Sequence, residues 1–89
     1  MTRKTIHFSG QVQGVGFRYT TQALARDFDV VGYVKNLPDG RVKLEVEGEA
    51  PEIDRFVARI REHLGGHIRH VDSSSSPAKG EFTDFRVAH

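Results

Sequence analysis

Residues 30–47 read VVGYVKNLPDGRVKLEVE, two runs of strand-forming residues joined by a turn. The second run alternates apolar with charged residues, which is the period of a strand with one buried face. Between the runs, Pro38 presets the φ angle of a turn's second position, and Gly40 tolerates positive φ at its last. The stretch therefore predicts a β-hairpin between residues 31–36 and 41–47.

Upstream of the hairpin, the pattern predicts a strand, a loop and a helix. Apolar residues recur at roughly alternate positions from Ile6 to Val12, as in a half-buried strand. A glycine-punctuated loop follows over residues 10–16. Helical spacing then predicts a helix that ends near Asp29, with one apolar stripe made of Phe17, Thr21, Leu24 and Phe28.

Downstream of the hairpin, the clearest element is a second helix. Pro51 suits its first turn, and Gly65-Gly66 ends it. Beyond this helix we expect a weak strand at 68–71, a flexible polar linker at 73–80 and a last strand at 82–87. The apolar face of the helix consists of Ile53, Phe56, Val57, Ile60 and Leu64.

The predicted order β-α-β-β-α-β is that of an α+β, ferredoxin-like sandwich. Its antiparallel sheet has the usual strand order 4-1-3-2, and both helices lie on one face. Eighty-nine residues are enough for one core but not for two, so we expect residues 1–89 to form a single domain.

This topology brings Asn36 close to the loop that follows the first strand. The first two strands are parallel and have the third between them, so both end at the same edge of the sheet. Two strand spacings, roughly 10 Å, separate their backbones. The side chains of Arg18 and Asn36 can reach across that distance into one pocket.

The loop before the first helix has features of an anion site. Gly14 and Gly16 allow successive backbone N–H groups to point inward, and the helix that follows begins with unpaired N–H groups. Arg18 adds a planar guanidinium that matches phosphate oxygens. A glycine-rich turn of this kind also occurs in proteins that bind no phosphate, and an Asn before a turn is usually a turn former. The residues alone leave both interpretations open.

Two motifs resemble those of a known family. Residues 10–18, GQVQGVGFR, closely match the signature loop of the acylphosphatases, and residues 32–42, GYVKNLPDGRV, match the second block of that family. The similarity covers nearly the whole chain. The match is weaker over residues 65–80, which are poor in apolar residues, and this leaves the limits of the fourth strand open.

The resemblance implies a free-standing enzyme that hydrolyses acyl phosphates to a carboxylate and inorganic phosphate without metal or cofactor. It assigns phosphate binding to Arg18 and the orientation of the attacking water to Asn36. The phosphate-binding backbone amides are those of Gln13, Gly14, Val15, Gly16, Phe17 and Arg18. An alternative is a non-catalytic, phosphate-binding or accessory domain of the same fold. We also expect Phe17 to anchor the loop in the core and Val15 to border the pocket.

Composition argues against several other classes of function. The chain has no cysteine for a disulfide or a thiolate site, and no apolar run of roughly 20 residues that could span a membrane. The sequence His63-x3-His67-x2-His70 is interrupted by two glycines and lacks a complete ligand set, so we expect no metal there. We expect a cytoplasmic monomer that acts on a small molecule and binds no membrane.

The charge distribution argues against nucleic acid as a partner. Net charge is +1, with +4 on residues 1–44 and −3 on residues 45–89. RNA-recognition domains of this topology need aromatic residues on the open face of strands 1 and 3, and the hairpin's second strand presents only charged residues there. The excess of basic residues in the first half nonetheless favours a small anion.

Overall fold

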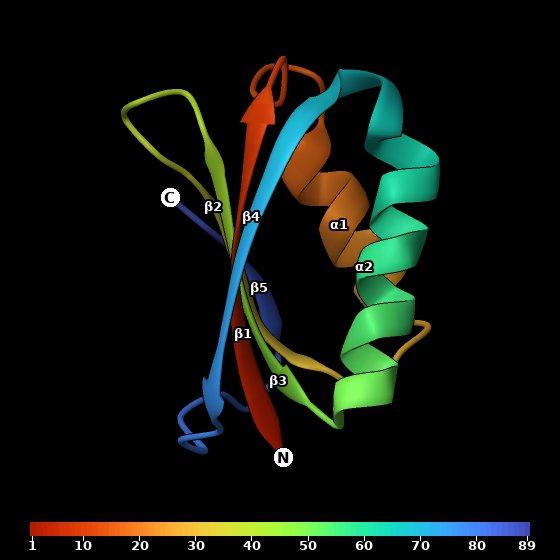
Figure 1. The fold of residues 1–89 in the computed structure, drawn as a ribbon, viewed down its shortest axis with the longest axis vertical. Helices are drawn as coiled ribbons and strands as arrows, with labels where there is room; N and C mark the ends of the chain where they lie inside the picture. Colours follow the sequence, from red (N-terminus) through yellow and green to blue (C-terminus); the bar gives the residue numbers. More distant parts are fainter.

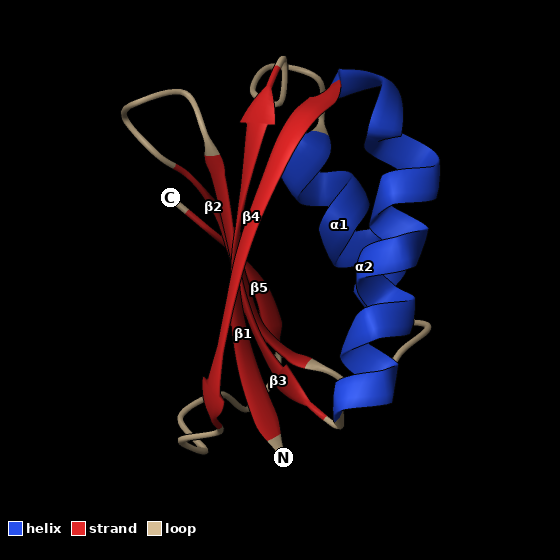
Figure 2. Cartoon of the chain, viewed as in Figure 1, coloured by secondary structure: helices blue, strands red, loops and turns tan.

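In the computed structural model, which describes residues 1–89, two α-helices lie on one face of a five-stranded sheet (Figures 1 and 2). The strand order is β4-β1-β3-β2-β5, and only the β2–β5 pair is parallel. None of the helices has the length and apolar character to cross a membrane. The elements in chain order are β1 (Thr2–Gly10), α1 (Phe17–Ala25), β2 (Val31–Asn36), β3 (Val42–Gly48), α2 (Ala50–Leu64), a 3₁₀ turn (Gly65–His67), β4 (Ile68–Pro77) and β5 (Phe85–Ala88).

The ferredoxin-like arrangement predicted from the sequence is confirmed. β1 to β4 have the order 4-1-3-2, and α1 and α2 cover the same side of the sheet (Figure 1). The hairpin between β2 and β3 is also as predicted, closed by a turn in which Gly40 N donates to Leu37 O at 3.1 Å. The predicted alternation in β3 is observed, because Val42, Leu44 and Val46 are all fully buried.

The core fills the space between the helices and the sheet. Fully burying a side chain such as Leu, Ile, Val or Phe contributes roughly 1.5–3 kcal/mol, so this layer dominates the stabilisation of the fold. Leu24 and Phe28 of the predicted stripe on the first helix are only partly buried, and Ala25 takes an inner position instead. The buried cluster consists of Ile6, Phe8, Val12, Phe17, Ala25, Val30, Val34, Val42, Leu44, Val46, Ile53, Phe56, Ile60 and Leu64.

α1 ends earlier than predicted, at Ala25 rather than near Asp29. The next three residues, Arg26 to Phe28, donate backbone hydrogen bonds three residues back instead of four. The tighter turns end the helix while keeping Phe28 against Phe56, with ring centroids 5.6 Å apart. The apolar spacing therefore continued past the point where the helix itself stops.

The prediction of a flexible linker over residues 73–80 is wrong for residues 73–77. β4 continues through Ser73–Ser76 to Pro77, and it pairs with β1 from Phe8↔Val71 to Thr2↔Pro77. Backbone hydrogen bonding to one neighbour is enough for an edge strand, and its exposed positions need no apolar side chain. Four consecutive serines do not show the apolar alternation that predicts a strand, but their backbone groups are hydrogen-bonded to β1.

The last predicted strand, over 82–87, is β5 at Phe85–Ala88, and it adds a fifth strand to the sheet. It pairs in parallel with β2 at the edge opposite β4. The chain therefore crosses the open face of the sheet between β4 and β5, over residues 78–84 (Figure 1). We call this segment the crossover loop.

A buried ion pair ties the crossover loop to the sheet. Arg3 donates to Glu47 Oε2 from Nε and to Glu45 Oε1 from Nη1, both at 2.7 Å. Glu47 also accepts hydrogen bonds from the backbone N–H groups of Lys79 and Gly80, at 2.9 and 3.1 Å. Glu47 lies on the open face, as the alternation in the hairpin's second strand predicts, but the crossover loop covers it and leaves it 3% exposed.

The same cluster includes two aromatic rings. Tyr33 and Phe82 meet edge to face at 5.9 Å, and the Arg3 guanidinium lies 4.9 Å from the Phe82 ring. Tyr33 also donates to Glu45 Oε2 at 2.7 Å. The open face of the sheet thus carries aromatic residues from β2 and the crossover loop, whereas β3 contributes only charges, as predicted.

Low pH should weaken the interactions of Glu47 that hold the crossover loop to the sheet. The hydrogen bond from the Lys79 N–H, helped by Arg3, holds the pKa of Glu47 below its ordinary value. A lowered pKa in the folded protein stabilises the fold at pH values above the unfolded pKa of about 4.3, and this stabilisation is lost as pH falls through the lower, folded value. We expect Glu47→Gln to reduce the free energy of unfolding by roughly 3 kcal/mol at pH 7, because Arg3 loses a buried partner.

Urea unfolding at pH 7 and pH 3 checks this expectation. The difference between wild type and Glu47→Gln should shrink at pH 3, because the carboxylate of the unfolded wild type, with a pKa of about 4.3, is protonated there and the charged form no longer favours the folded state fully. Glu49→Gln, at an exposed neighbouring position, is the control and should change stability by less than about 1 kcal/mol. A difference that stays constant with pH would contradict the role given to the Glu47 charge.

Candidate active site

The loop between β1 and α1 has the backbone of an anion site. Gly14 and Gly16 both have positive φ, 80° and 76°, a region that favours glycine. Gly16 precedes α1, and no side chain caps the helix. The first N–H groups of α1 therefore lack side-chain partners, and the first turn contains no acidic residue that would compete with an anion.

Two buried side chains fix the ends of this loop. Val12 is fully buried although it lies beyond the end of β1, and Phe17 is 2% exposed. The Phe17 ring packs on Phe8 with centroids 5.1 Å apart. The prediction that Phe17 anchors the loop in the core is confirmed.

Gln13 ties the loop to the β2–β3 turn. Its side-chain Nε2 donates to Leu37 O at 2.8 Å and to Arg41 O at 3.0 Å. The sequence assigned Gln13 a backbone role only, and it gave no signal for this side-chain contact, because both acceptors are backbone carbonyls. The contact holds the loop beside the end of β2 at one end of the sheet (Figure 2).

Asn36 lies at the end of β2, level with the end of β1. Phe8 of β1 and Asn36 of β2 are both paired with Val42 of β3, which lies between them. The Oδ1 atom of Asn36 is buried and has no hydrogen-bond partner. An unpaired buried acceptor of this kind costs about 1–3 kcal/mol, so it is well suited to accept a hydrogen bond from a ligand or a water.

Arg18 reaches the same place from the first turn of α1. Its Nη1 donates to Ala88 O at 3.3 Å and lies 3.2 Å from His89 Nδ1, so the end of β5 supports the guanidinium. Its Cζ is 5.9 Å from the centre of the Tyr19 ring. No sequence pattern pointed to this contact with β5, because the place of that strand in the sheet was not predicted.

Arg18 and Asn36 line one cavity of about 120 Å³. Val15, which was expected to border this cavity, is not among the lining residues, and its side chain is 38% exposed. Gln13 is not among the residues that line the cavity either. The lining residues are Val12, Gly14, Gly16, Phe17, Arg18, Tyr19 and Asn36.

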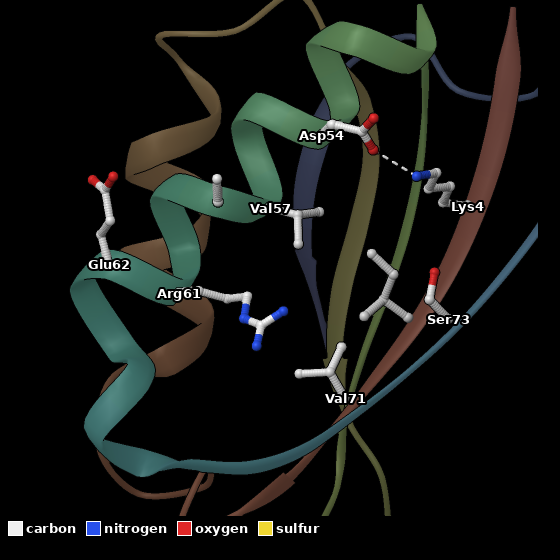
Figure 3. Close-up of a pocket in the computed structure, with 9 residues that line it drawn as sticks. Lys4, Asp54, Val57, Arg61, Glu62, Val71 and Ser73 are labelled. Carbon is white, nitrogen blue, oxygen red and sulfur yellow. Dashed lines mark hydrogen bonds and ion pairs between the residues drawn. The ribbon is translucent and has the colours of Figure 1, made fainter.

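Two larger hollows lack this convergence of polar groups. One, of about 520 Å³, lies between α2 and β4, where the ion pair of Lys4 and Asp54 closes one end and Arg61 points inward beside Val71 (Figure 3). The other, of about 510 Å³, borders β5 and the crossover loop. Neither contains an orphaned buried acceptor or a helix N-terminus.

The histidines do not assemble into a metal centre. His63 Nδ1 lies 3.2 Å from the carbonyl of Arg59 on its own helix. His67 lies in the 3₁₀ turn and His70 in β4. No three His, Asp or Glu side chains anywhere in residues 1–89 gather in a way that could hold a metal ion.

Known proteins resemble this chain along nearly its whole length. A family model described as acylphosphatase matches residues 4–87. A curated acylphosphatase of Lactobacillus gasseri is 40% identical over 91 aligned positions, which cover 100% of both chains.

Two solved structures share the fold over essentially the whole chain. The crystal structure of acylphosphatase from Bacillus subtilis has a TM-score of 0.89 and 29% identity, and the match covers 100% of both chains. Full-length HypF in its phosphate- and nucleotide-bound form has a TM-score of 0.88 and 31% identity, over 99% of this chain but only 12% of that one. With the family model matched from residue 4 to residue 87, this chain belongs to the acylphosphatase family.

Proposed function

We propose that this chain hydrolyses acyl phosphates in the cavity between Arg18 and Asn36. As a member of the acylphosphatase family it is an acyl phosphate hydrolase, and its substrate is a small molecule. The observation that supports the site is that Arg18 and Asn36, from different elements, line one cavity at the N-terminus of α1. The rest of the proposal assigns a role to each group.

The reaction needs no general acid. The bond between phosphorus and the acyl oxygen breaks, and the leaving group is a carboxylate whose conjugate acid has a pKa of roughly 4. Such a group leaves without being protonated at neutral pH. A site without a carboxylic acid or histidine among its lining residues is therefore sufficient for this substrate.

Arg18 and the loop amides bind the phosphoryl group. Phosphoryl transfer passes through a loose transition state whose charge is spread over the equatorial oxygens, so catalysis consists mainly of positioning and electrostatic stabilisation. The Arg18 guanidinium and the backbone N–H groups of residues 13–18 supply donors that are already in place. Gln13 keeps those amides in position through its two hydrogen bonds across to the β2–β3 turn.

Asn36 orients the attacking water. A water that donates a hydrogen bond to the buried Oδ1 keeps a lone pair free for the phosphorus atom. The new bond between phosphorus and the water oxygen forms as the acyl oxygen departs, and the water's proton passes to a phosphate oxygen. Asn36 thus lowers the reaction barrier by orienting the water, and it does not act as a base.

We further propose that residues 1–89 act as a single domain. A single buried cluster links both helices to three of the five strands, and partly buried residues of β4 and β5 pack against it. The alternative is an accessory domain that binds phosphate without turnover, and the match to 12% of the HypF chain shows that this fold also occurs within a longer protein. A cytoplasmic location, a monomeric state and the lack of nucleic-acid or membrane partners stay predictions from the sequence.

The direct test follows benzoyl phosphate hydrolysis by absorbance, with and without EDTA. Turnover that persists in EDTA supports the proposed enzyme and its independence of metal. A folded protein that binds phosphate without turnover would support the accessory-domain alternative.

Arg18→Ala should abolish binding and turnover together. Without the guanidinium, the charge on the phosphoryl group loses its one cationic partner, and we expect kcat/KM to fall by about a thousandfold or more. Affinity for inorganic phosphate, measured by calorimetry, should fall by at least about a hundredfold. Arg26→Ala, an exposed arginine at the other end of α1, is the matched control and should retain both.

Asn36→Ala should separate binding from turnover. We expect kcat to fall by roughly a hundredfold or more, because the water is no longer oriented, while the Kd for phosphate changes less than about threefold. Removal of an orphaned buried acceptor should leave the protein equally stable, or more stable by about 1 kcal/mol, in urea unfolding. An equal loss of phosphate affinity in Asn36→Ala and Arg18→Ala would show that the two roles are assigned wrongly.

A further inference from the structure

The phosphate cavity is too small to enclose an acyl phosphate that has a large acyl group. Its volume is about 120 Å³, whereas pockets that enclose an organic ligand typically measure about 300–1,000 Å³. If the cavity holds the phosphoryl group, the acyl group has to lie outside it. The surface around the opening therefore decides which acyl groups are favoured.

The geometry of the reaction fixes the side on which the acyl group lies. In an in-line displacement, the leaving oxygen is opposite the attacking water. The Oδ1 of Asn36, which holds the water in the proposed function, is buried, whereas Tyr19 lines the same cavity with 59% of its surface exposed. An acyl group that leaves on the side away from the buried Oδ1 can contact Tyr19, the most exposed of the apolar lining residues.

Two exposed apolar side chains belong to the segments that form this cavity. The chain has only three exposed large hydrophobic residues, Met1, Val15 and Tyr19. Two of the three flank the cavity, since Tyr19 lines it and Val15 lies between Gly14 and Gly16, which both line it. The Tyr19 ring lies 5.9 Å from the Arg18 Cζ, so it stands beside the phosphate-binding group.

The charge of the lining also discriminates between acyl groups. Arg18 is the only charged residue that lines the cavity, and in the proposed function it is occupied by the phosphoryl group. An acyl group with a second negative charge finds no other cation in this lining, whereas an uncharged ring can stack on Tyr19.

We infer that Tyr19 and Val15 form a subsite for the acyl group, which gives this enzyme a preference for acyl phosphates with uncharged aromatic or apolar acyl groups. The inference rests on the proposed function, because it uses the assignment of the water to Asn36. Tyr19 supplies the larger contact and Val15 a smaller one.

The test is the ratio of kcat/KM for benzoyl phosphate to kcat/KM for acetyl phosphate. Both substrates present the same phosphoryl group, so the ratio cancels any change in Arg18 or in the loop. Tyr19→Ala should lower the ratio about tenfold relative to wild type, and Val15→Ala about two- to threefold. Tyr19→Phe keeps the ring and is the matched control, with an unchanged ratio.

A second measurement tests the subsite without turnover. Phenyl phosphate and methyl phosphate carry the same charge and differ only in the group on the bridging oxygen. Calorimetry should give tighter binding of phenyl phosphate, by about tenfold in wild type and in Tyr19→Phe, and this advantage should be lost in Tyr19→Ala.

The outcomes separate the two proposals. A ratio that is the same in wild type and Tyr19→Ala overturns the subsite, even if both substrates are hydrolysed more slowly, and leaves the proposed function intact. A lack of turnover with both substrates contradicts the proposed function. The binding of phenyl phosphate then tests the subsite by itself. Tighter binding of phenyl than of methyl phosphate that depends on Tyr19 supports the subsite, and equal binding of both esters overturns it.

Discussion

The position of β3 between β1 and β2 is the constraint on which both the fold and the site depend. Val42 is paired with Phe8 on one side and with Asn36 on the other, so these two residues lie at the same level of the sheet. The strands that contain them are parallel and therefore end at the same edge. A shift of one residue in the β2–β3 pairing would turn Asn36 to the opposite face of the sheet and would also expose Val34, bringing Tyr33 or Lys35 to the buried face in its place. The alternating pattern of β3, which is fully buried at Val42, Leu44 and Val46, makes such a shift costly.

Much of this arrangement could be predicted because it is encoded in local patterns. The hairpin follows from the period of β3 and the turn at Pro38–Gly40, and the helical face of α2 follows from the spacing between Ile53 and Leu64. Once these elements were assigned, topology alone brought Arg18 and Asn36 toward one pocket. The roles of individual atoms were supplied by resemblance to a family, because a glycine loop and an asparagine at a turn are common without any catalytic function.

The features that the sequence did not predict depend on contacts with no local signature. Ser73–Ser76 belong to β4 because β1 offers them backbone partners, a property of the neighbouring strand. Glu47 alternates as an outward residue should, yet it is buried because the crossover loop donates two N–H groups to it from residues 32 and 33 positions later in the chain. Gln13 reaches backbone carbonyls, which every residue possesses. In each case the hydrogen-bond partner is a backbone group or belongs to a distant segment. The spacing of apolar residues in the sequence carries no information about either kind of partner.

The size of the cavities shows how little enclosed space this chemistry requires. The two larger hollows, each above 500 Å³, are lined by side chains such as Lys4 and Arg86 that are already paired with Asp54 and Asp84. The smallest cavity is the one with an unsatisfied buried oxygen and the uncapped N-terminus of a helix. An enzyme whose substrates share only a phosphoryl group needs to enclose that group alone, because enclosing the acyl group would restrict it to one substrate. Unpaired polar groups therefore indicate the proposed site better than volume does, and in that proposal the acyl group lies at the open rim, where contact is weak and many groups can be accommodated.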